Sequence, residues 1–274
     1  MSDLDPLLQA AAAGPVPEAG FRVLEALRAR HGASDADVAR LTRWSAQLAA
    51  RIRGDDASLP ADPLQRPTLV YLDGFVDRAW HEPARHPVTA ELESAAEMIR
   101  SELLDRVPGR QDWPEYAAGV AEDGKWRACW FYRYGRRVRE TAALYPRTSA
   151  LLDAHSGEGG ALASTLGDVF LSRLEPGGRI PPHNGLCNIS LVGHLALVVP
   201  PRCGIRVGAE WREWQAGKTL VFDDTFEHEC RNDSEADRYV LVFALWQPGV
   251  RGIEREFIHA ITRWLNDVVA RPAG

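Results

Sequence analysis

The sequence contains little lysine, no long apolar run and no excess of positive charge. Lysine occurs only at Lys125 and Lys218 among 274 residues, which indicates a composition bias rather than a function. The formal net charge of -6 argues against a nucleic-acid partner, because proteins that bind phosphate backbones are usually basic. No apolar run approaches the roughly 20 residues that span a bilayer, and the N-terminal stretch MSDLDPLLQAAAAG lacks the positive charge of a signal peptide. We therefore expect a cytoplasmic protein without a membrane span.

Paired cysteines are also missing. None of the cysteines belongs to a C-x-x-C pair, so a structural zinc knuckle is not expected. In a cytoplasmic chain of this size, these thiols are expected to be reduced and packed in the interior. The cysteines are Cys129, Cys187, Cys203 and Cys230.

The first sixty residues have a helical pattern. FRVLEALRARHG carries regularly spaced apolar residues and stops at a glycine. In the next segment Ser34 is placed to cap a helix, Asp37 lies in its first turn, and Gly54 ends the apolar periodicity. The Pro- and Asp-rich stretch 54–67 is typical of a linker. We therefore assign residues 1–60 to an N-terminal helical segment, packed on itself or on the following domain.

Residues 61–274 predict a mainly β domain with helical support. TLVYLDGF (68–75) and WRACWFYRYG (126–135) have strand character, and a helix is expected over about 89–107. From residue 167 to 248, short β-rich runs alternate with turns, and an amphipathic helix closes the chain. This order is typical of a double-stranded β-helix, a jelly-roll or cupin-like barrel, behind N-terminal helices.

The β-rich region contains His183, His194 and His228, of which the first and last lie at turn–strand boundaries. Such positions open into the mouth of a β-barrel, where two histidines can bind one transition metal. Non-haem iron sites commonly add a carboxylate, as H-x-D or H-x-E. Here the third position is Gly185, so the histidines alone leave a purely structural role open.

Arg238 and Ser172 suggest an anion-binding site. Arg238 stands among apolar residues of RYVLVFAL, and burying a guanidinium is unfavourable unless it meets an anion. A bidentate pair with a carboxylate is one solution, and Ser172 on DVFLSRL can donate to the same group. The alternatives are a solvated arginine and an ordinary strand serine.

Four segments resemble the aspartyl/asparaginyl β-hydroxylases. They are EPGGRIPPHNG, HLALVVP, EWQAGKTLVFDDTFEHE and RYVLVFALWQP, within a weaker similarity over about 66–248. The resemblance implies an Fe(II)- and 2-oxoglutarate-dependent dioxygenase that consumes O2 and hydroxylates an unactivated C–H bond. Succinate and CO2 would be released.

The resemblance also implies residue roles. His183 and His228 match the metal ligands, and Gly185 matches a glycine that this family has in place of the acid. Asp224 matches an acid near the metal that orients its bound water. The positions associated with 2-oxoglutarate are Ser172, His194 and Arg238.

The sequence departs from the family at Ser190 and Val192, where arginines are frequent. The substrate therefore stays open between an aspartyl or asparaginyl residue and a related amino-acid-like molecule, presented as a small molecule, a peptide or a carrier-bound group. Two other functions also stay open. One is a halogenase with halide in the vacant carboxylate position, and the other is a non-catalytic cupin-like binding module.

Two clusters of charge flank these motifs. Glu227 and Glu229 alternate with His228 along a strand, so both are expected to point away from the metal. The arginines of YRYGRRVRE form either a solvated face or a contact for a substrate carboxylate. These are Arg133, Arg136, Arg137 and Arg139.

Overall fold

The computed structural model describes residues 11, 14–55, 59–106, 113–116, 124–133, 135–157, 159–164 and 166–269. The helical elements are η1 (Val16–Glu18), α2 (Ala19–His31), α3 (Asp35–Arg53), η2 (Pro83–Arg85), α4 (Pro87–Ser94), α5 (Ala96–Leu104), α6 (Arg139–Leu144), α7 (Pro146–His155) and α8 (Gly252–Val269). The strands are β1 (Trp80–His81), β2 (Trp126–Arg133), β3 (Arg136–Arg137), β4 (Val169–Leu174), β5 (Arg179–His183), β6 (Ser190–Val198), β7 (Cys203–Val207), β8 (Glu210–Glu213), β9 (Thr219–Phe222), β10 (His228–Asn232) and β11 (Arg238–Trp246).

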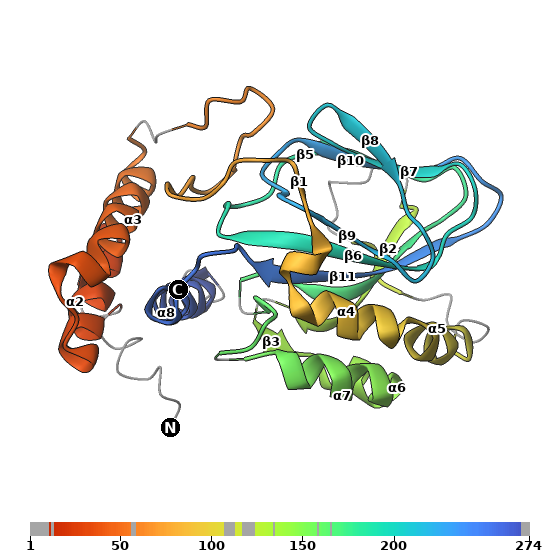
Figure 1. Cartoon of the computed structure of the whole chain (residues 1–274), viewed down its shortest axis with the longest axis horizontal. Coiled ribbons are helices and arrows are strands. Elements are labelled where there is room, and N and C mark those ends of the chain that lie inside the picture. The colour runs from red at the N-terminus through yellow and green to blue at the C-terminus, as the bar shows by residue number, and fades with distance from the viewer. Residues whose placement is uncertain are drawn as a thin grey trace.

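Two antiparallel sheets form the β-domain (Figure 1). The major sheet has the order β1-β9-β6-β11-β4-β2-β3, and the minor sheet has the order β5-β10-β7-β8. From β4 onward the chain crosses repeatedly between them: β4, β6, β9 and β11 belong to the major sheet, and β5, β7, β8 and β10 to the minor one. This winding is the predicted double-stranded β-helix.

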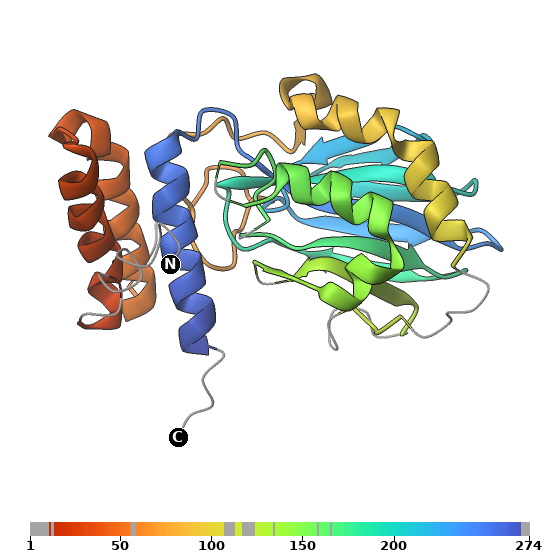
Figure 2. The same ribbon diagram turned by 90° about the horizontal axis from the view of Figure 1, so that it is seen from below.

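Each face of the major sheet is covered, which explains why every residue of β11 is buried. Helices α4 to α7 lie on its outer face, as Figures 1 and 2 show. Its inner face packs on the minor sheet through a separate apolar cluster that includes Phe170, Ile205 and Val240. The inner face is open at one end, where the cavity described below begins.

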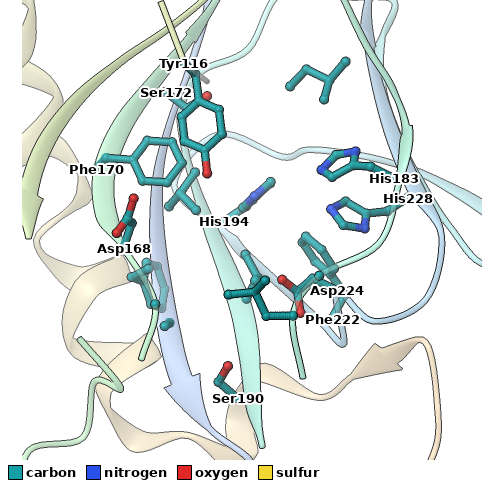
Figure 3. Close-up of a pocket in the computed structure, with 18 of the residues that line it drawn as sticks. Tyr116, Asp168, Phe170, Ser172, His183, Ser190, His194, Phe222, Asp224 and His228 are labelled. Atoms are coloured by element: carbon teal, nitrogen blue, oxygen red, sulfur yellow. The ribbon is translucent and has the colours of Figure 1, made fainter. Parts of the chain in front are cut away.

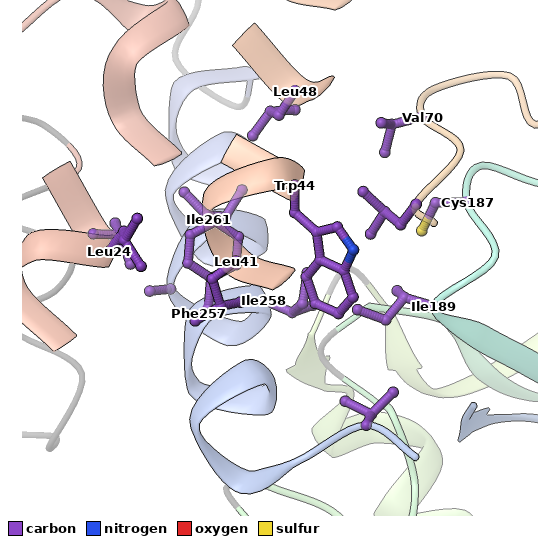
Figure 4. Packing of buried hydrophobic residues seen from close by; sticks show 14 of the residues in the cluster. Leu24, Leu41, Trp44, Leu48, Val70, Cys187, Ile189, Phe257, Ile258 and Ile261 are labelled. Carbon is purple, nitrogen blue, oxygen red and sulfur yellow. The ribbon is translucent and has the colours of Figure 1, made fainter. Parts of the chain in front are cut away.

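The N-terminal helices form as predicted. Ser34 caps α3: its hydroxyl accepts a hydrogen bond from the Asp37 amide, and the Asp37 carboxylate accepts one from the Ser34 amide. Helix α8 lies between this helix pair and the barrel (Figure 2). Trp44, only 1% exposed, packs in the same apolar cluster as Ile261 of α8 and Ile189 of the barrel (Figure 4).

A buried carboxylate joins α3 to α8. Glu254, which is fully buried, accepts hydrogen bonds from the guanidinium groups of Arg40 and Arg251. Two cations around one acid hold the two helices in a fixed register. The division of the chain near residue 60 stays a prediction, although the helical segment shares its core with the barrel.

The prediction of one continuous helix over about 89–107 is wrong, because the structure has two helices there, α4 and α5. Ala95 separates α4 from α5, and the Ser94 hydroxyl donates to the Ala90 carbonyl at 2.8 Å. Such back-bonding by serine bends helices. The predicted end at Val107 lies outside the described residues.

The segment 68–75, predicted to be a strand or strand-like, does not form a regular strand. The Thr68 and Leu69 amides donate to the carbonyls of Gly185 and Leu186, but only one isolated bridge, from Val70 to Cys187, is formed. Further along, the Asn188 side chain satisfies both backbone groups of Leu72: it accepts a hydrogen bond from the amide and donates one to the carbonyl, both at 2.8 Å. The segment therefore crosses the barrel without adding a strand.

The cysteine prediction is confirmed, since Cys129, Cys187, Cys203 and Cys230 are free and buried. Within the described part of the chain, no helix has both the length and the apolar character needed to cross a bilayer.

Candidate functional site

A cavity of about 450 Å³ opens between the two sheets and contains every predicted site residue. This volume is within the range of small-molecule sites, roughly 300–1,000 Å³. Figure 3 shows His183 and His228 on one side and Tyr116 and Phe170 on the other, with His194 between them. The predicted ligands, acid and anion-binding residues therefore come together from β4, β5, β6, β10, β11 and the loop before β10.

His183 and His228 are paired residues of neighbouring antiparallel strands. His183 ends β5, His228 begins β10, and the two are in register. Their ring centroids lie 4.0 Å apart, with the planes inclined by 49°. The residue pair at this end of β5 and β10 thus places two imidazoles side by side at the cavity (Figure 3).

Both rings are oriented by the same backbone contact. Nδ1 of His183 donates to the carbonyl of Pro181 at 2.8 Å, and Nδ1 of His228 donates to the carbonyl of Phe226 at 3.0 Å. A carbonyl only accepts, so the proton of each neutral ring is on Nδ1 and the Nε2 lone pair is available. This arrangement is typical of metal-binding histidines.

Burial keeps these rings uncharged. It lowers the pKa of His183, and burial together with the neighbouring His183 lowers the pKa of His228 to about 3. Neutral imidazoles at pH 7 are the form that binds a transition metal. The pair could therefore hold such an ion without first losing protons.

Asp224 occupies the space beside Gly185. A Cβ at Gly185 would come closer than 3.0 Å to the Asp224 carboxyl group, and the Gly185 amide donates to the Asp224 carbonyl at 2.6 Å. The glycine of H-x-G is therefore required by a carboxyl group that arrives from the loop before β10. Burial, aided by Asp223, raises the pKa of Asp224 to about 8.

Arg238 is the most deeply buried cation at the site. It is 1% exposed, and Nη1 donates to the Ser172 hydroxyl at 3.3 Å. Nε and Nη2 have no partner, although both are buried. Two unsatisfied guanidinium donors at a cavity are the feature expected of a carboxylate site.

Ser172 is held ready to donate. Its oxygen accepts from Arg238 and from the Trp126 indole, the latter at 3.0 Å. Its own proton is therefore directed away from both groups. Sequence reasoning missed Trp126, because only the cross-strand register brings β2 beside β4.

His194 closes the same end of the cavity. It is buried, its ring stacks on Trp214 with centroids 6.0 Å apart, and its Nδ1 has no partner. Burial, with a contribution from Arg238, holds the pKa of His194 well below its usual value. Trp214 also lies under the Arg238 guanidinium, 5.0 Å from its ring centroid.

The acids around His228 divide as predicted. Glu227 and Glu229 both pair with Arg206, at 2.7 and 2.5 Å, and neither lines the cavity. Asp223 is structural, because its Oδ1 accepts from the amide and the hydroxyl of Thr225. Of these acids, only Asp224 lines the cavity, together with His228.

An aromatic wall faces the histidine pair, and sequence reasoning missed it. Tyr116 stacks on Trp126, Phe170 and Trp130, with centroid separations of 3.8, 5.1 and 5.8 Å. The alternating aromatics of WRACWFYR were a signal for a β-strand, but nothing in the sequence placed Tyr116 on top of them. A short stretch alongside β2 brings it there.

The arginine cluster separates into different roles. Arg137 forms an ion pair with Asp153 at 2.7 Å, away from the cavity. Arg133 is exposed and lines the cavity, with its guanidinium 4.2 Å from the Trp130 ring centroid. The contact of this cluster with a substrate stays a prediction.

Fold and site together define a double-stranded β-helix protein with a paired-histidine pocket and a buried arginine. Among the residues that the structure describes, no three His, Cys, Asp or Glu side chains are grouped so as to hold a metal ion. The candidate metal donors at the cavity are the two histidines.

The chain belongs to the aspartyl/asparaginyl beta-hydroxylase family, whose model matches residues 93–248. The mouse aspartyl/asparaginyl beta-hydroxylase is 31% identical over 201 residues, which is 71% of this chain and 26% of that protein. The mouse aspartate beta-hydroxylase domain-containing protein 2 is 34% identical over 240 residues, covering 82% of this chain and 68% of the relative. The chain thus spans about a quarter of the length of the first of these relatives.

A lipid-modifying protein is similar as well. The ornithine lipid ester-linked acyl 2-hydroxylase of Rhizobium tropici is 30% identical over 177 residues, covering 61% of this chain and 60% of that protein. Among solved structures, a Pseudomonas putida prolyl-4-hydroxylase aligns with a TM-score of 0.37 and 15% identity, over 60% of this chain and all of that one.

Proposed function

We propose that the protein is an Fe(II)- and 2-oxoglutarate-dependent dioxygenase that hydroxylates its substrate. The observation that carries this proposal is the pairing of two Nε2-presenting imidazoles with a buried, half-satisfied guanidinium in one cavity. Membership of a hydroxylase family supports it. Iron and 2-oxoglutarate would together activate dioxygen for attack on an unactivated C–H bond, with release of succinate and CO2.

The residues at the site fit both groups. His183 and His228 offer neutral nitrogen donors, which suit a divalent transition metal. Arg238 offers two unmet donors for the distal carboxylate of 2-oxoglutarate, and Ser172 offers a hydroxyl proton beside them. His194 lies between these two ends, so its unpartnered Nδ1 is placed to contact the same molecule.

Asp224 would position water rather than bind the metal directly. Its carboxyl group lies against Gly185, two residues beyond a candidate ligand, and carries a proton near neutral pH in the metal-free protein. A carboxyl group there can hydrogen-bond to a metal-bound water and fix its direction. The walls of the cavity would limit the access of other water to the reacting carbon.

The test is 2-oxoglutarate turnover by the purified protein with Fe(II), measured as succinate formation. His183→Ala and His228→Ala should each abolish turnover and weaken Mn(II) binding by about 100-fold or more, since each removes half of the protein's donor set. Glu229→Ala is the matched control, because it lies next to His228 but pairs with Arg206 on the other side of the strand. Full turnover in either histidine variant would refute the ligand assignment.

The same assay separates the two alternatives. A halogenase would give a chlorinated product in chloride buffer, detected by product mass. The Asp224 carboxyl group fills the volume beside Gly185, and this observation favours the hydroxylase. A non-catalytic binding module would bind neither Mn(II) nor 2-oxoglutarate.

The relatives limit the substrate only broadly. Their names give aspartyl and asparaginyl residues in one case and an ester-linked acyl chain of a lipid in another. For this chain we propose a peptide, small-molecule or carrier-bound substrate, whose chemistry is set by the wall of the cavity beyond the cosubstrate.

A further inference from the structure

We infer that the substrate places an apolar group, an alkyl side chain or an acyl segment, in the cavity beside the metal site. This inference rests on the proposed function and names the substrate chemistry of that same site. The observation behind it is a continuous apolar surface on the major sheet, between the anion-binding end of the cavity and its mouth. We call this surface the apolar wall; its members are Trp130, Phe170, Val192, Val242 and Ala244.

Strand register builds the apolar wall. Trp130 is paired with Phe170, and Phe170 is paired with Val242, which is paired in turn with His194. Paired residues of adjacent strands point to the same face of a sheet, and all four line the cavity. One row across the sheet thus leads from His194 at the cosubstrate end to Trp130 at the edge.

A second row lies one step nearer the mouth. Val192 is paired with Ala244, and both line the cavity. These short side chains leave room in front of them, whereas Phe170 and Trp130 in the first row are large. Leu166 and Leu186 continue the apolar surface outward, and Leu186 is 56% exposed. An apolar chain could therefore run from solvent to the histidine pair along these side chains.

The charges at the cavity do not suit an acidic substrate group. Among the described lining residues, Arg133 and Arg238 are the arginines, and no lysine is present. Arg238 lies at the opposite end with Ser172. Arg133 is exposed, with its guanidinium over the Trp130 ring, and it follows Trp130 on β2, which is three strands away from β6 and Val192. Asp168, which accepts from the Trp130 indole at 2.9 Å, adds negative charge. A carboxylate against Val192 would be desolvated without a cation, which is unfavourable.

The experiment compares four neutral or acidic probes on the full chain. N-acetyl-leucinamide represents an amino-acid side chain, and octanamide an acyl segment. N-acetyl-aspartamide is the acidic probe, and N-acetyl-asparaginamide is its neutral counterpart. Binding is followed by protein fluorescence, because Trp126 and Trp130 line the cavity. Each titration is made in metal-free protein and again with Mn(II) and 2-oxoglutarate, whose own binding is measured on the same samples.

At least one apolar probe should bind about tenfold or more tightly than the acidic probe, the discrimination expected of an apolar pocket. The better of N-acetyl-leucinamide and octanamide identifies the source of the apolar group. Equal or tighter binding of N-acetyl-aspartamide would overturn the inference, as would a lack of measurable binding by both apolar probes. Failure to bind Mn(II) and 2-oxoglutarate would instead count against the proposed function alone.

Two variants at one position sharpen the result. Val192→Arg adds a cation to the wall and should reverse the order of the apolar and acidic probes. Val192→Thr keeps the branched shape but replaces one methyl group with a hydroxyl, and should weaken the apolar probes only a few-fold without favouring the acidic one. An unchanged order of affinities in Val192→Arg, with Mn(II) binding intact, would show that the probes bind elsewhere and would overturn the inference.

Discussion

The carboxyl group of Asp224 lies where the side chain of residue 185 would begin. A Cβ at Gly185 would be closer than 3.0 Å to that carboxyl group, a separation that real Cβ atoms do not show. Gly185 is not held at a positive φ, so its backbone accepts any residue. The neighbouring acid alone excludes a side chain, and the two positions are coupled.

This coupling predicts the outcome of a double-mutant cycle. Gly185→Ala should lower the free energy of unfolding by about 1–3 kcal/mol, the usual effect of overpacking. In an Asp224→Ala background the same substitution should have almost no effect, because the shortened side chain lacks the carboxyl atoms that clash. Urea denaturation of the four proteins measures the coupling. Additive effects would show that the two residues do not compete for one volume.

Asp224 also predicts a dependence of stability on pH in the metal-free protein. Burial raises its pKa from 3.8 to about 8, so the folded protein keeps a proton that the unfolded chain releases near pH 4. The stabilisation is complete below about pH 4 and is lost as the pH rises toward 8, with a slope of at most about 1.4 kcal/mol per pH unit.

Asp224→Asn should remove this slope, since an amide does not titrate. The measurement is the difference in unfolding free energy between variant and wild type from pH 4 to 8, in a chelating buffer. His183 and His228 titrate in both proteins, so their effects cancel in the difference, whereas the part of the slope that arises from the repulsion between Asp223 and Asp224 is lost with Asp224. A difference that stays constant with pH would place the Asp224 pKa near its ordinary value.

Arg238 is expected to lower the stability of the ligand-free protein while it strengthens the binding of 2-oxoglutarate. Arg238→Met should leave the ligand-free protein as stable as wild type or more so, because it removes a buried cation with two unmet donors. The same variant should bind 2-oxoglutarate about 100-fold more weakly. Thermal unfolding with and without Mn(II) and 2-oxoglutarate tests both statements.

Ser172→Ala is the matched comparison for Arg238→Met. It removes one donor while Arg238 stays, so 2-oxoglutarate affinity should fall only about 5- to 10-fold. If Arg238→Met bound 2-oxoglutarate as well as wild type, the guanidinium would have another function.

Glu254 predicts how firmly the N-terminal helices are attached. Glu254→Gln should lower the free energy of unfolding by about 3–5 kcal/mol, because it leaves Arg40 and Arg251 without their buried acid. Hydrogen exchange should accelerate first in α3 and α8, ahead of the barrel strands. Glu256→Gln is a suitable control, since its pair with His31 is at the surface. Equal destabilisation by the two variants would contradict this assignment.

Local sequence signals fixed those elements that depend on neighbours in the chain. Ser34 and Asp37 form a cap within one helical turn, and the short β-rich runs predicted between residues 167 and 248 include β4, β6 and β11. Residues 68–75 do not form a regular strand, and the prediction of a continuous helix over 89–107 was wrong. In the first segment, the side chain of the distant Asn188 forms hydrogen bonds with the backbone amide and carbonyl of Leu72. In the second, the Ser94 hydroxyl donates to the carbonyl of the preceding turn and bends the helix.

The site shows the same division. The sequence by itself predicted the residues of the candidate site, and His183, His228, Asp224, Ser172, His194 and Arg238 all line one cavity. Only the tertiary structure decided why Gly185 must be a glycine, how Trp126 orients Ser172, and which apolar residues face the substrate. Those relationships depend on contacts between strands far apart in the chain, and strand register is set by packing across the two sheets rather than by any local pattern.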